Sequence, residues 1–139
     1  MSAGVLMDTG PLVAYFCKPE DRHQWAVDQF ATFVPPVLTC EPVLTETCFL
    51  LARKRIPERR LLEKVQQGVF QIGLHLDAQI EPVISLMERY DNLPMSLADA
   101  CLVRMAELFD QHCVCTLDSD FTVYRKRGRD PLNLIMPGR

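Results

Sequence analysis

Short apolar segments alternate with longer amphipathic segments along this chain, and that alternation limits the fold more than any other feature of the sequence. Each apolar segment is short enough for a buried β-strand and is followed by residues typical of turns or helix starts. We expect five short strands, at residues 5–7, 37–39, 69–74, 113–117 and 132–136. Strands that alternate with helices in this way predict an α/β sandwich with a mainly parallel central sheet.

The segments between the strands carry the signals of helix ends. Pro11 suits a first helical position because its missing N–H would have no partner there, which makes residues 9–10 a tight turn. Asp21, Asp77 and Ser96 are predicted N-caps of later helices. We expect helices at residues 11–16, 22–33, 41–55, 57–67, 78–90 and 97–110.

The composition is that of an ordinary globular chain, with 48% apolar and 24% charged residues. No apolar run approaches the roughly 20 residues that a membrane span needs, and the N-terminus has no signal-peptide pattern. No linker divides the sequence, so we expect one cytoplasmic domain over residues 1–139. In the cytoplasm the six cysteines are expected to be reduced, and most of them to be buried. The three histidines are scattered and share no zinc-ligand spacing.

The formal net charge of −3 is not the basic signature of an electrostatic nucleic-acid binder. The basic residues nevertheless gather in two clusters. The first comprises Arg53, Lys54, Arg55, Arg59 and Arg60, and the second comprises Arg125, Lys126, Arg127 and Arg129. Each cluster is either a set of solvated loop and helix-end residues or part of a basic rim that holds phosphates beside an acidic centre.

Glu46 is the acidic residue whose position is hardest to explain. On a helix its neighbours three and four positions away are apolar: Pro42, Val43, Phe49 and Leu50. We therefore expect Glu46 on an apolar stripe, where an ionised carboxylate costs several kcal/mol unless it is paired or bound to a cation. The alternative is that the stripe ends at Glu46 on the surface, or that the residue forms a buried ion pair.

Other carboxylates stand at the ends of strands or at the starts of helices. Asp8 follows the first strand, Asp118 and Asp120 follow the fourth, and Asp99 lies in the first turn of a helix. Simpler interpretations exist, because an acid in a first helical turn complements the helix dipole and aspartates form Asx turns. In a parallel α/β layout, however, these positions meet at one edge of the sheet.

Carboxylates that converge repel one another, and a divalent cation is the natural way to neutralise them. An all-oxygen set without cysteine or histidine suits Mg²⁺ or Mn²⁺ rather than Zn²⁺. Such a site can lower the pKa of a bound water and stabilise the charge that develops on a phosphodiester. The sequence therefore favours metal-assisted phosphodiester hydrolysis.

Four segments of the chain resemble, in order and spacing, the motifs of PIN-domain nucleases, most closely the VapC-type toxins of bacterial toxin–antitoxin pairs. These segments are LMDTGPL at 6–12, PVLTE at 42–46, LADA at 97–100 and TLDSDF at 116–121. Each is weak by itself, but together they span most of the chain. The resemblance implies a compact three-layer α/β/α sandwich and Mg²⁺-dependent hydrolysis of single-stranded RNA.

The same resemblance implies roles for individual residues and for partners. It assigns the metal-binding and catalytic acids to Asp8, Glu46, Asp99 and Asp118, with Asp120 replacing or assisting Asp118. Thr9 and Thr116 match positions where a hydroxyl helps to hold a carboxylate. Members of the family usually form homodimers and are blocked by a small antitoxin protein.

Two other functions remain open. A Mg²⁺-dependent phosphatase or phospho-acceptor domain needs a second acid beside the first, or a lysine at a later strand end. Here Thr9 and Gly10 follow Asp8, and no lysine stands at that strand end. The second alternative is a PIN-like module that binds RNA or a protein without cleaving, against which the presence of all four acids argues only weakly.

Five aromatic residues gather near the N-terminus and also have two interpretations. They are Tyr15, Phe16, Trp25, Phe30 and Phe33. They could form a surface that receives an antitoxin or a second copy of the chain. They could equally be the core of two packed helices.

Overall fold

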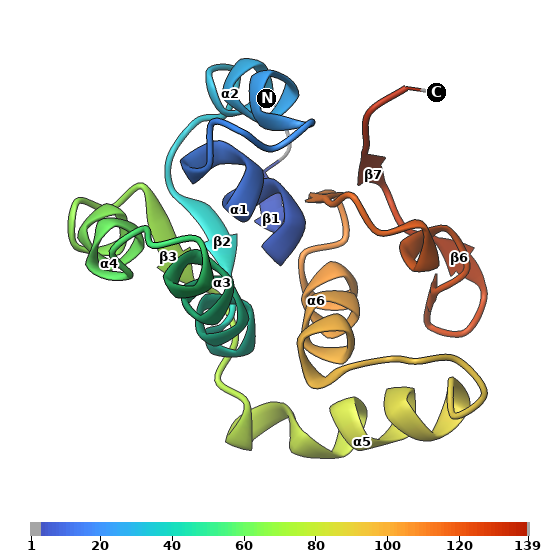
Figure 1. The fold of residues 1–139 in the computed structure, drawn as a ribbon. Coiled ribbons are helices and arrows are strands. Elements are labelled where there is room, and N and C mark those ends of the chain that lie inside the picture. Colours follow the sequence, from blue (N-terminus) through green and yellow to red (C-terminus); the bar gives the residue numbers. More distant parts are fainter. Residues whose placement is uncertain (1–3, 139) are drawn as a thin grey trace.

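The computed structural model describes residues 4–138, so the two ends of the expected domain over residues 1–139 lie outside the described residues. Its centre is a sheet of five strands in the order β3-β2-β1-β4-β7, and every neighbouring pair is parallel (Figure 1). The strands are β1 (Val5–Met7), β2 (Val37–Thr39), β3 (Phe70–Ile72), β4 (Cys113–Cys115) and β7 (Leu134–Ile135). The predicted parallel sheet is confirmed, although its last three strands are shorter than expected.

Strand β1 lies at the middle of the sheet, and all three of its residues are buried. Leu6 pairs with Leu38 on one side and with Val114 on the other, and its own side chain is fully buried. Central parallel strands covered on both faces are apolar throughout rather than alternating. This explains why Val5, Leu6 and Met7 run directly into Asp8.

Six α-helices flank the sheet in the described part of the chain. They are α1 (Thr9–Phe16), α2 (His23–Phe30), α3 (Glu41–Arg53), α4 (Arg59–Gln66), α5 (Ile80–Arg89) and α6 (Leu97–Leu108). Helix α1 packs on α2 and α3, while α6 packs on α5 and crosses β1 and β4 (Figure 1). The result is the expected α/β/α sandwich, with helices on both sides of a parallel sheet.

Several predicted helix starts were wrong. Helix α1 begins at Thr9 rather than at Pro11, so the expected tight turn is the first turn of the helix, capped by Asp8. Pro11 fits there because the first four N–H groups of a helix lack partners. Helix α2 begins at His23 without a side-chain cap, so Asp21 does not cap it, and the helix ends at Phe30.

Four short elements that sequence patterns did not predict lie in the second half of the chain. Asp77 lies inside the 3₁₀ helix η1 (Asp77–Gln79), where it accepts a hydrogen bond from the Ala78 N–H. After β4, the 3₁₀ helix η2 (Ser119–Thr122) leads into an antiparallel hairpin of β5 (Arg125–Lys126) and β6 (Asp130–Pro131). This hairpin folds back along α6.

One apolar core joins the sheet to its helices. All six cysteines are free; Cys48 and Cys113 are half-buried and the other four are buried, as expected for small apolar side chains. Within residues 4–138, no helix has both the length and the apolar character that crossing a membrane requires.

Candidate active site

Three of the predicted acids meet at the carboxyl edge of the sheet. Asp8 directly follows β1, Asp118 follows β4, and Asp99 is the third residue of α6. Their charges act on one another: Asp99 and Asp118 both raise the pKa of Asp8, and Asp118 raises the pKa of Asp99. The convergence expected from the parallel layout therefore brings Asp8, Asp99 and Asp118 within electrostatic reach.

Asp8 is the most buried of the three and both of its oxygens are held. Oδ1 accepts a hydrogen bond from the Thr9 N–H at 2.8 Å, and Oδ2 accepts one from the Thr116 hydroxyl at 2.6 Å. Burial raises the pKa of Asp8 to about 6, the two hydrogen bonds oppose the rise, and Asp99 and Asp118 add to it. Asp8 is thus a fixed carboxylate whose ionised form lacks a counter-charge.

The two threonines take different parts. The Thr116 hydroxyl also accepts a hydrogen bond from the Asp118 N–H at 2.9 Å, so it connects the Asp8 carboxylate to the Asp118 loop. The expected contact from the Thr9 hydroxyl is not there: the hydroxyl is buried and has no hydrogen-bond partner among the described residues. Thr9 supports Asp8 through its backbone N–H instead.

Asp99 is held by a capping box and by a residue that sequence reasoning missed. Its N–H donates to the Ser96 hydroxyl at 3.1 Å, and its Oδ2 accepts the Ser96 N–H at 3.4 Å. The hydroxyl of Tyr124 also donates to Oδ2, at 3.0 Å. Burial raises the pKa of Asp99. No local signal pointed to Tyr124, because it lies 25 residues from Asp99 in an unpredicted segment.

Asp118 and Asp120 are distinguished by the groups that their charges reach. Asp118 is exposed, and its Oδ1 accepts the Asp120 N–H at 2.9 Å, which is the Asx-type cap of η2. Its charge nevertheless raises the pKa of both Asp8 and Asp99, and the charges of Asp118 and Asp120 both raise the pKa of Tyr124. This difference favours Asp118 over Asp120 as the acid that faces the other two.

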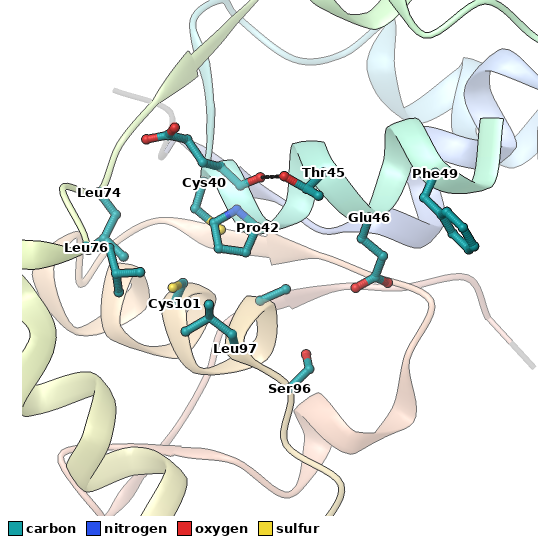
Figure 2. A pocket seen from close by; sticks show the side chains of 12 residues that line it. Cys40, Pro42, Thr45, Glu46, Phe49, Leu74, Leu76, Ser96, Leu97 and Cys101 are labelled. Atoms are coloured by element: carbon teal, nitrogen blue, oxygen red, sulfur yellow. Dashed lines mark hydrogen bonds between the residues drawn. The ribbon is translucent and has the colours of Figure 1, made fainter. Parts of the chain in front are cut away.

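Glu46 is exposed, so the expectation that it lies on a buried apolar stripe was wrong. Helix α3 buries Val43, Thr47 and Leu51, while Phe49, which shared the supposed stripe, is 58% exposed. Glu46 makes no hydrogen bond or ion pair with the described residues. Figure 2 shows its carboxylate directed from α3 towards the side of a cavity on which Ser96 lies.

That cavity, of about 700 Å³, lies beside the three acids rather than over them. It runs between α3 and the start of α6, and apolar side chains form most of its wall (Figure 2). Its lining residues include Pro42, Phe49, Leu74, Leu76 and Leu97, with Glu46 and Ser96 among the polar ones. Glu46 thus borders this cavity, whereas Asp8, Asp99 and Asp118 are not among its lining residues.

No basic side chain neutralises Asp8, Asp99 or Asp118 by an ion pair in the part of the chain that the structure describes. The same residues also hold no preformed cage of three or more acid, histidine or cysteine ligands. Mg²⁺ does not need one, since it usually keeps several waters and binds through one or two carboxylates together with substrate phosphates. The unpaired oxygen donors therefore fit a hydrated Mg²⁺ or Mn²⁺ ion.

The side chains of the second basic cluster bond to partners within the chain. Lys126 is buried and donates to the carboxylate and the carbonyl of Asp110, both at 3.0 Å. Arg127 pairs with Asp110 and Asp130, and Arg129 pairs with Asp130. The first cluster is exposed, with Lys54 paired to Glu20 and Arg59 to Glu63, so the phosphate role stays open for its remaining members.

The five N-terminal aromatic residues are partly buried side chains around the core. Tyr15 stacks on Phe30 with ring centroids 4.5 Å apart, and Phe30 packs edge-on against Phe70 of β3. Phe16, Trp25 and Phe33 likewise pack against the buried core. This favours the interpretation of these residues as the packing between helices α1 and α2.

Comparison with known proteins agrees with this geometry. The chain is 24% identical over 135 residues to ribonuclease VapC26 of Mycobacterium tuberculosis (strain ATCC 25618 / H37Rv), an alignment that covers 94% of this chain and 99% of that protein. Its fold matches the crystal structure of Mycobacterium tuberculosis VapC20, described as a sarcin-ricin loop cleaving toxin. That match has a TM-score of 0.74 and 23% identity, and covers 86% of this chain and 94% of the other. The PIN domain family model matches residues 5–127, and the chain therefore belongs to the PIN domain family.

Proposed function

We propose that this chain is a single-domain, Mg²⁺-dependent endoribonuclease that hydrolyses phosphodiester bonds of single-stranded RNA as the toxin of a toxin–antitoxin pair. The observation that carries the proposal is the convergence of Asp8, Asp99 and Asp118 without a basic partner. Membership of the PIN domain family supports it. So do the similar proteins, of which one is named a ribonuclease and the other a loop-cleaving toxin.

In this proposal each acid has its own part. Asp8 and Asp99 bind the cation, since they are buried and their carboxylates are held in place by neutral hydrogen-bond donors. Asp118 is exposed and completes the pocket on the substrate side, with Asp120 assisting, and Glu46 approaches from α3. Bound there, Mg²⁺ (or Mn²⁺) would lower the pKa of a water and offset charge on the phosphate. The Thr116 hydroxyl holds the Asp8 carboxylate next to the Asp118 loop, since it bonds to both.

The test is cleavage of a panel of labelled single-stranded RNAs in Mg²⁺, with and without EDTA. We expect EDTA-sensitive cleavage that Asp8→Asn lowers by about 100-fold or more, because several kcal/mol of charge stabilisation are lost. Asp91→Asn removes an exposed acid in the turn after α5 and is the matched control, with an unchanged rate expected. Cleavage that survives EDTA, or full activity in Asp8→Asn, would contradict the proposal.

The same assay distinguishes the alternatives. RNA binding without cleavage on the whole panel would favour the non-cleaving module. Mg²⁺-dependent release of phosphate from a small phosphomonoester, with intact RNA, would favour the phosphatase.

We also propose that the chain acts in the cytoplasm as a homodimer and that a small antitoxin blocks its site, as the resemblance to VapC-type toxins implies. Support for a protein partner comes from Phe49 and Leu97, which are 58% and 40% exposed beside the apolar cavity. Such exposed apolar groups are typical of interaction surfaces. Light scattering on the purified protein measures the assembly, and a monomer at micromolar concentration would contradict the dimer.

A further inference from the structure

We propose that Tyr124 is a positioning residue that orients Asp99 for cation binding. This inference rests on the proposed function and adds to it a residue that none of the four motif segments contains. Tyr124 lies between η2 and β5, and its hydroxyl donates a hydrogen bond to Asp99 Oδ2 at 3.0 Å. The phenol therefore contacts the acid directly, although it does not itself supply a metal ligand.

The position of the Tyr124 hydroxyl is determined by packing. The side chain is fully buried, and its ring makes edge-on contacts with Phe121 at 5.2 Å and with Tyr90 at 5.1 Å between centroids. A tyrosine enclosed in this way has few alternative rotamers, so its hydroxyl stays where the carboxylate needs it.

The backbone on both sides of Tyr124 is held as well. The Arg125 guanidinium donates to the carbonyls of Thr122, Val123 and Tyr124, and the Arg125 N–H donates to the Tyr90 hydroxyl at 2.8 Å. Lys126, the next residue, is buried against Asp110. Tyr124 and its neighbours are thus held by Tyr90, just after α5, and by Asp110, just after α6.

The bonds that Asp99 makes leave one of its oxygens for the cation. Tyr124 and the Ser96 N–H both donate to Oδ2, and no described residue donates to Oδ1. With Oδ2 held twice, the carboxylate has a defined orientation and presents Oδ1 as its unbonded oxygen. We infer that Oδ1 is the atom that contacts the cation.

The chemistry of the donor supports this role. Asp8 is likewise held by a hydroxyl, that of Thr116, and neither acid contacts a lysine or arginine in an ion pair within the described residues. A neutral donor orients a carboxylate without cancelling its charge, which a basic residue would do. Outer hydrogen-bond partners of metal ligands typically change metal affinity or activity by about 10–100-fold when they are replaced.

The experiment compares Tyr124→Phe with Tyr15→Phe. Both keep the aromatic ring and lose a hydroxyl, but Tyr15 lies on α1 and stacks on Phe30, not on a residue that holds Tyr124. Binding of Mn²⁺ is followed by the loss of the free-ion signal in electron paramagnetic resonance, without RNA. We expect Tyr124→Phe to weaken Mn²⁺ binding about 10-fold or more, and Tyr15→Phe to leave it unchanged.

Two further measurements separate positioning from folding. The Mg²⁺ concentration for half-maximal RNA cleavage should rise in Tyr124→Phe, and the rate should recover at saturating Mg²⁺. In an Asp99→Asn background, Tyr124→Phe should cause no further loss of Mn²⁺ binding, because the group through which it acts is gone.

The outcomes that overturn the inference are distinct. If the unchanged protein and Tyr124→Phe bind Mn²⁺ equally well and cleave RNA, the role of Tyr124 is refuted and the proposed function stands. Equal weakening in both tyrosine variants, with matching losses of melting temperature, would show a packing role only. If the unchanged protein neither binds Mn²⁺ nor cleaves RNA, both proposals fail.

Discussion

Acidic residues lie near each end of helix α6, and the two groups differ in ion pairing and in the direction of their pKa shifts. At its start, Asp99 lies with Asp8 and Asp118, and burial raises the pKa of both Asp8 and Asp99. Just beyond its end, Asp110 binds Lys126 and Arg127, whose hydrogen bonds lower its pKa. The acids at the start of α6 have no basic partner among the described residues, whereas Asp110 forms ion pairs with Lys126 and Arg127.

The helix explains part of this difference. The amino end of a helix carries partial positive charge, so acids at the start of α6 are tolerated there without a basic partner. The carboxyl end carries partial negative charge, and Lys126 bonds both the carboxylate and the backbone carbonyl of Asp110. A charge that serves the fold is paired within the chain, and a charge left unpaired is available for a ligand.

We expect the largest change in stability from removing one of the unpaired charges at the start of α6. Asp8→Asn should stabilise the metal-free protein at pH 7 by about 3 kcal/mol, because the folded pKa of about 6 exceeds the ordinary 3.8. Such a raised pKa means that the folded state binds the proton more tightly. The stability of the unchanged protein should therefore fall as the pH rises from about 4 to about 6. Urea unfolding in EDTA at pH 4.5 and pH 7.5 measures this, and a destabilised Asp8→Asn at pH 7.5 would refute it.

Removing a basic partner near the end of α6 should lower the stability of the protein rather than raise it. Lys126→Met should destabilise the protein by about 2 kcal/mol, since it leaves the Asp110 carboxylate and carbonyl without their buried donor. The rate of RNA cleavage per folded molecule should fall far less than in Asp8→Asn, because Lys126 bonds to Asp110 and to none of the three acids. Arg129→Met is the control, because that side chain is exposed. Thermal unfolding and the cleavage assay together check this, and a loss of activity without a loss of stability would contradict it.

A bound cation should supply the acids at the start of α6 with the positive charge that Asp110 already has, and so should stabilise the protein. At a concentration ten times its dissociation constant, Mg²⁺ should stabilise the protein by about 1.4 kcal/mol at pH 7.5. The gain should be smaller at pH 5, where Asp8 is mostly protonated. Differential scanning calorimetry measures it. Asp99→Asn should lose the gain and Asp110→Asn should keep it; a gain of equal size in both would sink the idea.

The smallest effect should come from Glu46. Because it is exposed and unbonded among the described residues, Glu46→Gln should change stability by less than about 0.5 kcal/mol. Its effect on RNA cleavage should also be smaller than that of Asp8→Asn, since Glu46 is exposed whereas Asp8 is buried and held by two hydrogen bonds. Parallel single-turnover rates decide this, and an equal loss in the two variants would place Glu46 at the cation.

The positions of Asp8 and Asp99 could be predicted because they depend on local signals. A buried strand that runs into a carboxylate and a Ser96 cap three residues before Asp99 are both visible in the sequence. Glu46 was misjudged because helical spacing shows which residues share a stripe, but not whether that stripe faces the core. Phe49 lies on it and is largely exposed.

The sequence by itself determined the parallel α/β order and the edge of the sheet where carboxylates gather, because strand length, capping and apolar patterning are local properties. Only the tertiary structure decided which charges are paired. Lys126 and Asp110 are 16 residues apart, and Tyr124 and Asp99 are 25 apart, so chain folding alone brings each donor to its acid. Electrostatic pairing depends on distances through space, and those follow from the packing of the hairpin along α6.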